Sequence, residues 1–412
     1  MANKPKIRFK GFDDAWEQRK LGDVVERVTR KNQDLVSQLP LTISAQYGLI
    51  DQNMFFDKRV ASKDVSGYYL IYNGEFAYNK STSSDAPWGA IKRLDRYENG
   101  VLSTLYIVFK IKNEKVINSD FLVTYYDTCN WHKDIKAVAA EGARNHGLLN
   151  IAPADFFKTE LMLPQDIEEQ KKIGSYFKLI DHLITLHQRK CDQMKELKKY
   201  MLTKMFPQNG AKVPEIRFDG FIDDWEQRKL GDVAEFSKGS GYSKGDLVEY
   251  GTPIILYGRL YTNYETRISD VDTFVEAKVG SVYSKGGEVI VPASGETAED
   301  IARAATVDKS GILLGGDLNI VMPNKDINSS FLAISISSGN PQRELAKKAQ
   351  GKSVVHIHNE EIKNLVLPFP IKDEQNKIAS YFCQLDNLIT LHQHKCNELR
   401  EIKKYMLKNM FI

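Results

Sequence analysis

The 412-residue sequence has few cysteines and no long apolar run. Its four cysteines, Cys129, Cys191, Cys383 and Cys396, form no C-x-x-C pair, so reduced thiols in a cytosol are expected rather than a disulfide framework. No segment approaches the roughly 20 consecutive apolar residues that span a bilayer, and the first dozen residues lack the apolar stretch of a signal peptide. We therefore expect a cytoplasmic chain without a membrane span.

An excess of charge of either sign is also missing. The 57 lysines and arginines are balanced by 54 aspartates and glutamates, for a net charge of +3. Net charge alone therefore indicates no polyanionic partner, and a nucleic-acid surface would have to come from local patches. The 42% of hydrophobic residues is typical of globular proteins, and the chain is long enough for two or more cores.

Several catalytic motifs are absent as well. The chain contains no two adjacent prolines, which excludes the N-P-P-Y or D-P-P-Y loop of an N6-adenine methyltransferase. Its G-x-G at Gly239 to Gly241 lacks the later glycine of a dinucleotide cradle, and no G-x-x-x-x-G-K-[ST] phosphate loop is present. The eight histidines and four cysteines have no recognised zinc spacing. We expect neither catalytic residues nor a metal site in this chain.

The most prominent feature that is present is a tandem duplication. PKIRFKGFDDAWEQRKLGDV, from Pro5, matches PEIRFDGFIDDWEQRKLGDV, from Pro214. A longer matched pair occupies residues 169–206 and 374–411, where both copies begin E-Q-x-K-I-x-S-Y-F and end K-K-Y-M-L-x-x-M-F. Each half therefore consists of an opening motif, a variable region and a repeated segment. We expect Trp16 and Trp225 to anchor the opening motifs in a core.

The repeated segments are predicted to be long helices. They contain helix-forming residues and no proline, and Asp166 with Glu169 resembles a capping box at the start of the first one. About 38 residues would form a rod of roughly 57 Å. Apolar residues recur at near-heptad spacing, and a single helix with such a seam is unstable alone, so its natural partner is the other copy. The predicted helix–helix interface consists of Ile173, Phe177, Ile180, Ile184, His187, Met194, Ile378, Phe382, Leu385, Ile389, His392 and Leu399.

His187 and His392 interrupt the two seams at the same place, near the middle of each segment. If the two copies pack in opposite directions, the two side chains should approach one another. A polar pair that fixes the register of the helices is the favoured interpretation, with metal binding or proton chemistry as the alternatives.

The two variable regions share little sequence with each other. Both contain short strand-like runs separated by polar turns and followed by a helix-like stretch, which predicts an α+β domain in each half. The predicted organisation is a first domain at 1–163, a helix at 164–206, a turn-rich linker at 207–213, a second domain at 214–369 and a second helix at 370–412.

The combination of these features resembles the specificity subunit of type I restriction-modification systems. The resemblance covers essentially the whole chain and includes YNKSTSSDAPWGAIKRL from Tyr78, GARNHGLLNIAPADFFKTELMLP from Gly142, PASGETAEDIARA from Pro292 and GKSVVHIHNEEIKNLVLPFP from Gly351. It implies an α+β fold in which two target-recognition domains are joined by two long antiparallel coiled-coil helices in a pseudo-two-fold tandem duplication.

The same resemblance implies a non-catalytic protein that binds double-stranded DNA, with each domain recognising one half of a bipartite target. The implied partners are two methyltransferase subunits, docked on the helices, and restriction/translocase subunits. Adenine methylation and restriction would then take place on those partners, which would also carry S-adenosylmethionine, ATP and magnesium.

Candidate DNA-binding residues are polar side chains on loops flanked by glycine, because base edges and phosphates are contacted by Arg, Lys, Asn, Ser and Thr held on a rigid scaffold. In the first domain they are Lys80, Ser81, Thr82, Lys92, Arg93, Arg144, Asn145 and His146. In the second domain they are Lys238, Ser240, Tyr242, Lys244, Arg259, Tyr261, Lys352, Ser353 and His356.

Two alternatives remain open at the level of sequence. A duplicated coiled-coil scaffold with protein-binding domains would explain the helices, but not why two domains in one frame differ so widely in their loops. An RNA-binding protein is disfavoured because the chain lacks an aromatic RNP-like pattern and a strongly basic tract.

Overall fold

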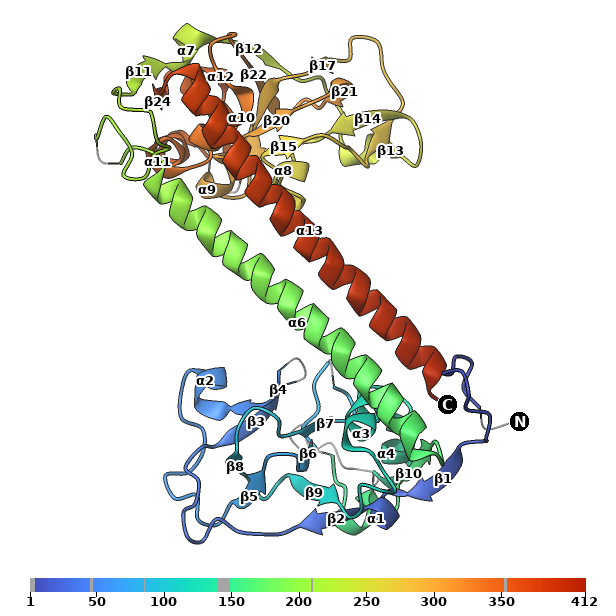
Figure 1. The fold of residues 1–412 in the computed structure, drawn as a ribbon. Helices are drawn as coiled ribbons and strands as arrows, with labels where there is room; N and C mark the ends of the chain where they lie inside the picture. The colour runs from blue at the N-terminus through green and yellow to red at the C-terminus, as the bar shows by residue number, and fades with distance from the viewer. Residues whose placement is uncertain (1–3, 45–46, 85, 140–148, 209, 352–353) are drawn as a thin grey trace. The chain divides into compact units, whose positions relative to one another are not determined.

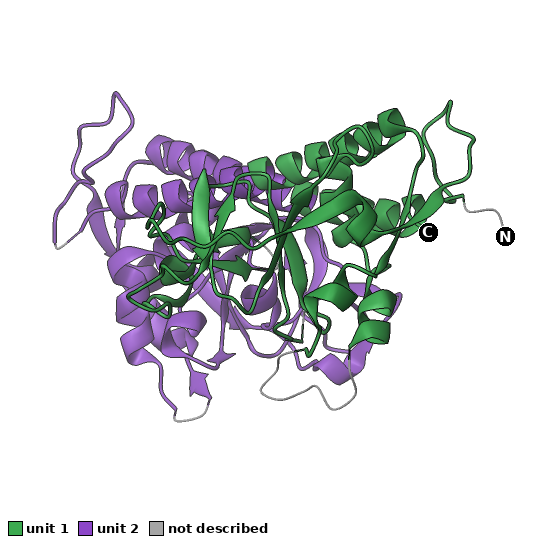
Figure 2. Ribbon diagram, turned by 90° about the horizontal axis from the view of Figure 1, so that it is seen from below, with its two compact units in different colours: residues 1–186, 395–412 green, residues 187–394 purple. Residues whose placement is uncertain are grey.

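The computed structural model describes residues 4–44, 47–84, 86–139, 149–208, 210–351 and 354–412 (Figure 1). The chain divides into two compact units: a first unit of residues 1–186 with 395–412, and a second unit of residues 187–394 (Figure 2). Each unit thus contains one variable domain and parts of both long helices. The predicted α+β fold, with two domains and two long helices, is confirmed.

The two long helices are α6, Ile167–Lys204, and α13, Lys372–Met410. At the start of α6 the Asp166 carboxylate accepts a hydrogen bond from the Glu168 backbone N–H at 2.8 Å. The predicted capping box is only half right, because both carboxylate oxygens of Glu169 accept from the Arg8 guanidinium, at 2.6 and 2.8 Å. Glu169 therefore ties the opening motif to the helix instead of closing the cap.

In the first unit, the beginning of α6 packs against the end of α13. The rings of Phe177 and Phe411 lie 6.1 Å apart, and the Asp181 carboxylate lies 2.7 Å from Lys403 Nζ. Further along α6, the carbonyl of Ile184 faces Cys396 Sγ at 3.5 Å. In these successive contacts the α6 residue number increases while the α13 residue number decreases. The two segments are therefore antiparallel.

In the second unit the same contacts recur with the helices exchanged. Phe382 lies 6.2 Å from Phe206, Asp386 lies 2.5 Å from Lys198 Nζ, and the Ile389 carbonyl faces Cys191 Sγ at 3.9 Å. His187 and His392 follow, with their Nδ1 atoms 2.9 Å apart, which is the contact that antiparallel pairing of two copies predicts.

The residues proposed for the helix–helix interface differ in burial along each helix. Those nearest the start of α6 or α13 are buried and also pack against a domain core: Ile173, Phe177, Ile180, Ile378, Phe382 and Leu385. Those nearer the middle are half-buried: Ile184, His187, Met194, Ile389, His392 and Leu399. The apolar seam therefore serves the domains as well as the helix pair.

The repeated opening motif forms the same joint in each unit. In the first, β1 (Glu17–Lys20) pairs antiparallel with β10 (Glu160–Leu163), and the one-turn helix α1 (Leu21–Val24) follows. In the second, β11 (Glu226–Lys229) pairs with β24 (Val366–Phe369), followed by α7 (Leu230–Val233).

The two tryptophans of this motif are core anchors, as predicted. Trp16 is 2% exposed and packs edge-on against Phe121 and Phe411. Trp225 is equally buried, and Phe331 and Phe206 take the same positions around it. Phe411, which follows α13, thus completes the core of the first unit, and Phe206, which follows α6, completes the core of the second.

The central sheets of the two variable domains share one strand order. The first unit has the antiparallel order β2 (Val25–Val28), β9 (Ile107–Ile111), β6 (Phe76–Asn79), β7 (Ala90–Arg93). The second unit has β12 (Ala234–Lys238), β22 (Leu318–Pro323), β18 (Glu288–Pro292), β20 (Ala305–Val307), with β15 (Arg267–Ile268) added parallel at the edge. Regions with little sequence in common therefore form one framework.

A helix packs beside each sheet and begins in the same way. Asn118 caps α3 (Ser119–Tyr126) by accepting from the Phe121 N–H, and Asn328 caps α10 (Ser329–Ile336) by accepting from the Phe331 N–H. A buried glutamine near the start of each long helix, Gln170 or Gln375, accepts from the backbone N–H of that asparagine, at 2.9 and 2.8 Å. Because asparagine satisfies otherwise unpaired helix donors, these caps fix where the two helices begin.

The remaining elements differ between the units. The first unit adds β3 (Leu41–Ser44) with β4 (Gly48–Asp51), β5 (Tyr69–Tyr72) with β8 (Asn99–Leu102), α2 (Gln52–Phe56), α4 (His132–Val138) and α5 (Pro153–Phe156). The second unit adds a five-stranded sheet of β13 (Leu247–Val248), β16 (Phe274–Val275), β14 (Thr252–Ile255), β21 (Ser310–Leu314) and β17 (Tyr283–Lys285), and the pair β19 (Ser294–Gly295) and β23 (Val355–His356). Its other helices are η1 (Lys244–Asp246), α8 (Arg259–Thr262), α9 (Ala298–Ile301), α11 (Gly339–Lys348) and α12 (Asn359–Lys363). Among the described residues, no helix combines the length and apolar character needed to cross a membrane.

Candidate nucleic-acid interface

In the first unit, the candidate loop directly follows the inner strand β6. The backbone carbonyl of Lys80 accepts from the Leu149 N–H at 3.0 Å, so the loop lies against the segment that leads into α5. The Ser81 N–H donates to the Asn79 side chain at 3.0 Å, which bends the chain immediately after the strand. Lys80 is half-buried, and burial lowers the pKa of its ammonium group. Three consecutive polar residues, Lys80, Ser81 and Thr82, are thus held at a strand end.

The second unit has the equivalent loop after its own inner strand, β18. The chain continues into β19, whose Ser294 and Gly295 pair with His356 and Val355 of β23, in the segment that leads into α12. Ser294 Oγ lies 3.1 Å from His356 Nδ1, and the Tyr261 hydroxyl donates to the Ser294 carbonyl at 2.6 Å. The two units therefore place a polar strand end against the same kind of loop.

Sequence reasoning included His356 and Tyr261 but missed the central residue of this group, Ser294. Its position follows from topology, because Ser294 comes after β18 as Lys80 comes after β6. The sequence signal was the segment PASGET, whose glycine fits a crowded position: a Cβ on Gly295 would lie 2.9 Å from the Tyr261 hydroxyl and 3.1 Å from Ile301 Cβ.

Some of the predicted DNA-binding cations are neutralised within their own unit. Lys92 Nζ lies 2.7 Å from Asp127, while the Arg93 guanidinium contacts both Asp95 and Asp120, at 2.6 and 2.7 Å. Although burial alone would raise the pKa of the Asp127 carboxyl, Lys92 and Lys403 hold it below the usual range. Both β7 cations therefore tie the sheet to helix α3 and its C-terminal turn.

Arg259 has the same structural role in the second unit. Its guanidinium contacts Glu265 at 2.9 Å and Asp272 at 2.8 Å, and it also donates to the Asp270 carbonyl. Only 11% of its side chain is exposed, so its charge is satisfied by the turns around α8. These ion pairs leave little of the Arg259 charge for an incoming phosphate.

The Gly-Ser loop after β12 is held by its own side chains. Ser240 Oγ accepts from the Val282 N–H at 3.1 Å, and the Tyr242 hydroxyl accepts from the Lys278 N–H at 2.7 Å. Lys238 and Lys244 are exposed on either side of these contacts. The loop thus presents two lysines on a fixed backbone.

The remaining candidates, Arg144, Asn145, His146, Lys352 and Ser353, lie outside the described residues. Their segments adjoin Leu149 and Val355, which contact the two strand ends. Among the described residues there is no group of three or more His, Cys, Asp or Glu side chains that could hold a metal ion.

Comparison with known proteins accounts for this duplicated arrangement. The family described as the type I restriction modification DNA specificity domain matches residues 13–196 and again residues 222–401. The chain belongs to this family. Both matches begin just before the tryptophan of an opening motif and run into a long helix, so the type I specificity family accounts for both halves.

Curated relatives carry the same description. The chain is 25% identical over 206 residues to a type I restriction enzyme specificity subunit of Methanocaldococcus jannaschii, in a match that covers 49% of this chain and 44% of the relative. A putative specificity subunit of the same organism is 26% identical over 223 residues, or 51% of this chain and 50% of the relative. In these matches the chain spans about half the length of the curated relatives.

A solved structure shares the fold over nearly the whole chain. The crystal structure of a type I restriction-modification system S subunit from M. genitalium aligns with a TM-score of 0.65, over 99% of each chain. Its sequence identity is only 12%, so this likeness concerns the fold alone.

Proposed function

We propose that this chain recognises a bipartite double-stranded DNA target and directs adenine methylation and restriction by partner subunits. Each unit would read one half of the target. The observation that carries the proposal is the pair of equivalent strand ends: Lys80 follows β6 of the first central sheet and Ser294 follows β18 of the second, so equivalent places carry different residues. Equivalent positions with different side chains are suited to reading different base edges.

The exposed apolar residues of the long helices support the docking of two methyltransferase subunits. Leu186, Ile402 and Tyr405 are exposed in the first unit, and their repeats Leu391, Leu197 and Tyr200 are exposed in the second. Contiguous apolar groups on a protein surface commonly mark interaction sites. Because the same three positions are exposed in each unit, we propose one methyltransferase subunit per unit.

The chemistry is assigned to the partners in this proposal. The methyltransferase subunits would bind S-adenosylmethionine, and restriction/translocase subunits would use ATP and magnesium. The specificity chain would contribute only the positioning of DNA and partners, in the cytoplasm where the DNA is accessible.

The deciding experiment is to sequence methylated adenines in a host that expresses this chain with its methyltransferase. We expect one methylated motif made of two specific halves separated by an unspecified spacer. A host methylome that is unchanged, or a single uninterrupted motif, would contradict the bipartite proposal.

An exchange of domains tests the assignment of one half to each unit. Residues 25–163 would be replaced by the corresponding region of another specificity subunit. Only one half of the methylated motif should change, because the second unit keeps its own sheet and loops. The replacement of both halves, or persistence of the original motif, would show that the units do not read separately.

A further inference from the structure

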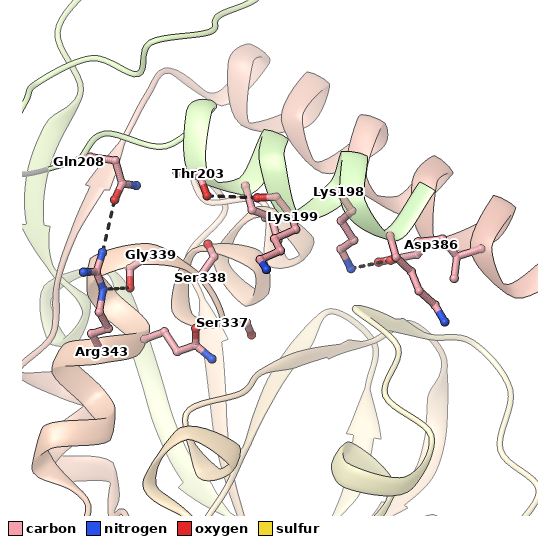
Figure 3. Close-up of a pocket in the computed structure, with 13 residues that line it drawn as sticks. Lys198, Lys199, Thr203, Gln208, Ser337, Ser338, Gly339, Arg343 and Asp386 are labelled. Atoms are coloured by element: carbon pink, nitrogen blue, oxygen red, sulfur yellow. Dashed lines mark hydrogen bonds and ion pairs between the residues drawn. The ribbon is translucent and has the colours of Figure 1, made fainter. Parts of the chain in front are cut away.

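Each unit contains a cavity between the final turns of a long helix and the C-terminal end of the helix beside the sheet. In the first unit the cavity measures about 920 Å³ and lies between the end of α13 and the residues after α3. In the second unit it measures about 460 Å³ and lies between the end of α6 and the residues that join α10 to α11 (Figure 3). Neither cavity includes the loop at Lys80 or at Ser294, and the candidates Lys92 and Arg93 that line the first cavity are ion-paired within their unit.

The two cavities are built from repeated residues. The α13 residues that line the first are Arg400, Lys403, Lys404, Leu407 and Lys408, and the residues 205 positions earlier that line the second are Lys195, Lys198, Lys199, Leu202 and Thr203. An ion pair between the helices closes one side of each cavity, from Lys403 to Asp181 and from Lys198 to Asp386. The duplication has therefore preserved the cavity as well as the helix.

The lining of both cavities is strongly cationic. The first is lined by seven lysines and arginines and three aspartates, and the second by four lysines and arginines and one aspartate. Within the described part of the chain, Lys404 and Lys199 form no ion pair, although they occupy equivalent positions and are exposed. On a chain whose net charge is +3, the two cavities are local concentrations of positive charge.

Apolar side chains lie beside these cations. Leu407 and Ile184 line the first cavity, and Leu202 and Ile389 line the second. Figure 3 shows Lys198 and Lys199 reaching from α6 above the Ser337–Gly339 segment. A mixed cationic and apolar lining suits a polypeptide segment that carries both carboxylates and apolar side chains, whereas a bare phosphate would use only the cations.

We propose that each cavity receives an acidic, partly apolar segment of one methyltransferase subunit. This rests on the proposed function, which supplies two identical partners for two equivalent sites. The helix residues that line the cavities belong to the repeated frame and not to the variable loops, so the cavities suit an occupant that is the same in both units. Each cavity also adjoins the proposed docking surface, because the lining residues Lys408 and Thr203 lie three positions after the exposed Tyr405 and Tyr200, on the same face of the helix.

The test reverses the charge at the two equivalent lysines, Lys404→Glu in the first unit and Lys199→Glu in the second. The full chain is titrated with its methyltransferase subunit, and affinity and stoichiometry are measured by analytical ultracentrifugation. Each single variant should retain one normal site and bind its second methyltransferase at least about tenfold more weakly, because it opposes like charges. The double variant should bind methyltransferase more weakly at both sites. Raising the salt concentration should reduce the difference in affinity between this variant and wild type.

Lys136→Glu and Lys325→Glu are the matched controls, since both lysines are exposed and lie outside the cavities. They should bind two methyltransferase subunits as wild type does. Circular dichroism and hydrogen exchange establish that every variant is folded.

The possible results separate this inference from the proposed function. Normal binding of two methyltransferase subunits by the double variant would overturn the inference and leave the proposed function intact. A double variant that binds methyltransferase normally but loses affinity for a DNA duplex would also overturn it, because nucleic acid would then occupy the cavities. A wild-type chain that binds no methyltransferase would overturn both.

Discussion

The two units of this protein are alike where the variable domain joins the helices and different where the strands end. The ion pairs Arg8–Glu169 and Arg217–Glu374 have nearly the same geometry, with shortest distances of 2.6 and 2.7 Å. After the inner strand, however, the first unit forms a polar turn at Lys80 and the second adds a short strand at Ser294. The repeated residues therefore hold each domain on the helices, while the unrepeated residues shape the surface offered to a ligand.

The largest effect on stability is expected at the two buried tryptophans. Trp16→Ala and Trp225→Ala should each destabilise their own unit by about 3–5 kcal/mol, because each leaves a large void among aromatic rings. Hydrogen exchange resolved by unit is the appropriate measurement, since a chain with two cores need not unfold in one step. Losses that differ greatly between the two variants would show that the joints are not energetically equivalent.

The buried ion pairs provide the next largest effect. Arg8→Ala and Arg217→Ala each leave a carboxylate that is at most 1% exposed without its partner. We expect the free energy of unfolding of each variant to fall by roughly 3 kcal/mol at neutral pH. The matched controls, Arg8→Ala with Glu169→Gln and Arg217→Ala with Glu374→Gln, should recover part of it, because no buried charge then remains. Thermal unfolding of the four variants measures this, and equal losses in single and double variants would argue against the ion-pair explanation.

Substitutions in the two unlike loops should each weaken recognition of only one half of the DNA target. Lys80→Ala should weaken recognition of the first unit's half-site by about 1–3 kcal/mol if Lys80 contacts a base. His356→Ala should do the same for the second unit's half-site. Affinity for duplexes altered in one half at a time, measured with the assembled methyltransferase, tests both variants. A uniform loss over all duplexes would instead identify a phosphate contact.

The smallest effect is expected at the histidine pair. Burial, with the nearby His187 and Lys190, lowers the pKa of His392. The unfolded chain therefore binds more protons than the folded chain, so this contribution to stability is present above the ordinary histidine pKa of about 6.5 and is lost as the pH falls below it. Protection factors for hydrogen exchange along α6 and α13, which correct for the intrinsic effect of pH on exchange, should thus be smaller at pH 5.5 than at pH 7.5, and His392→Asn should reduce the difference. An undiminished pH effect in that variant would assign it to other groups.

The repeated parts of the chain were the easiest to predict. The helices and their pairing follow from heptad spacing and from identity between the copies, as does the burial of Trp16 and Trp225, whereas the antiparallel direction of the pair was implied by the family resemblance. The common sheet could not be predicted in the same way, because its strand order depends on pairing between distant segments such as β9 and β6. The DNA-binding candidates also remain predictions, since solvent-exposed and ion-paired cations have the same sequence signature.

Arg93 and Glu169 illustrate why the rest was harder. Arg93 is a cation near a polar loop in the sequence, yet its partners Asp95 and Asp120 neutralise it within the fold. The spacing of three residues from Asp166 predicts a capping box for Glu169, but its partner Arg8 lies 161 positions away. Spacing describes local geometry, while the choice between a local and a distant partner is made only when the chain is folded.

The completion of the first core by Phe411 has a consequence for the order of events on the ribosome. The second unit is a continuous stretch of chain, but the first needs residues 395–412, which are synthesised after the whole of the second. At roughly 5–20 residues per second, the first domain would wait for about 10–40 seconds with Trp16 and Phe177 lacking their aromatic partner. During that interval the nascent chain exposes an aromatic surface that chaperones can bind, so the N-terminal domain of this protein is the one that finishes folding last.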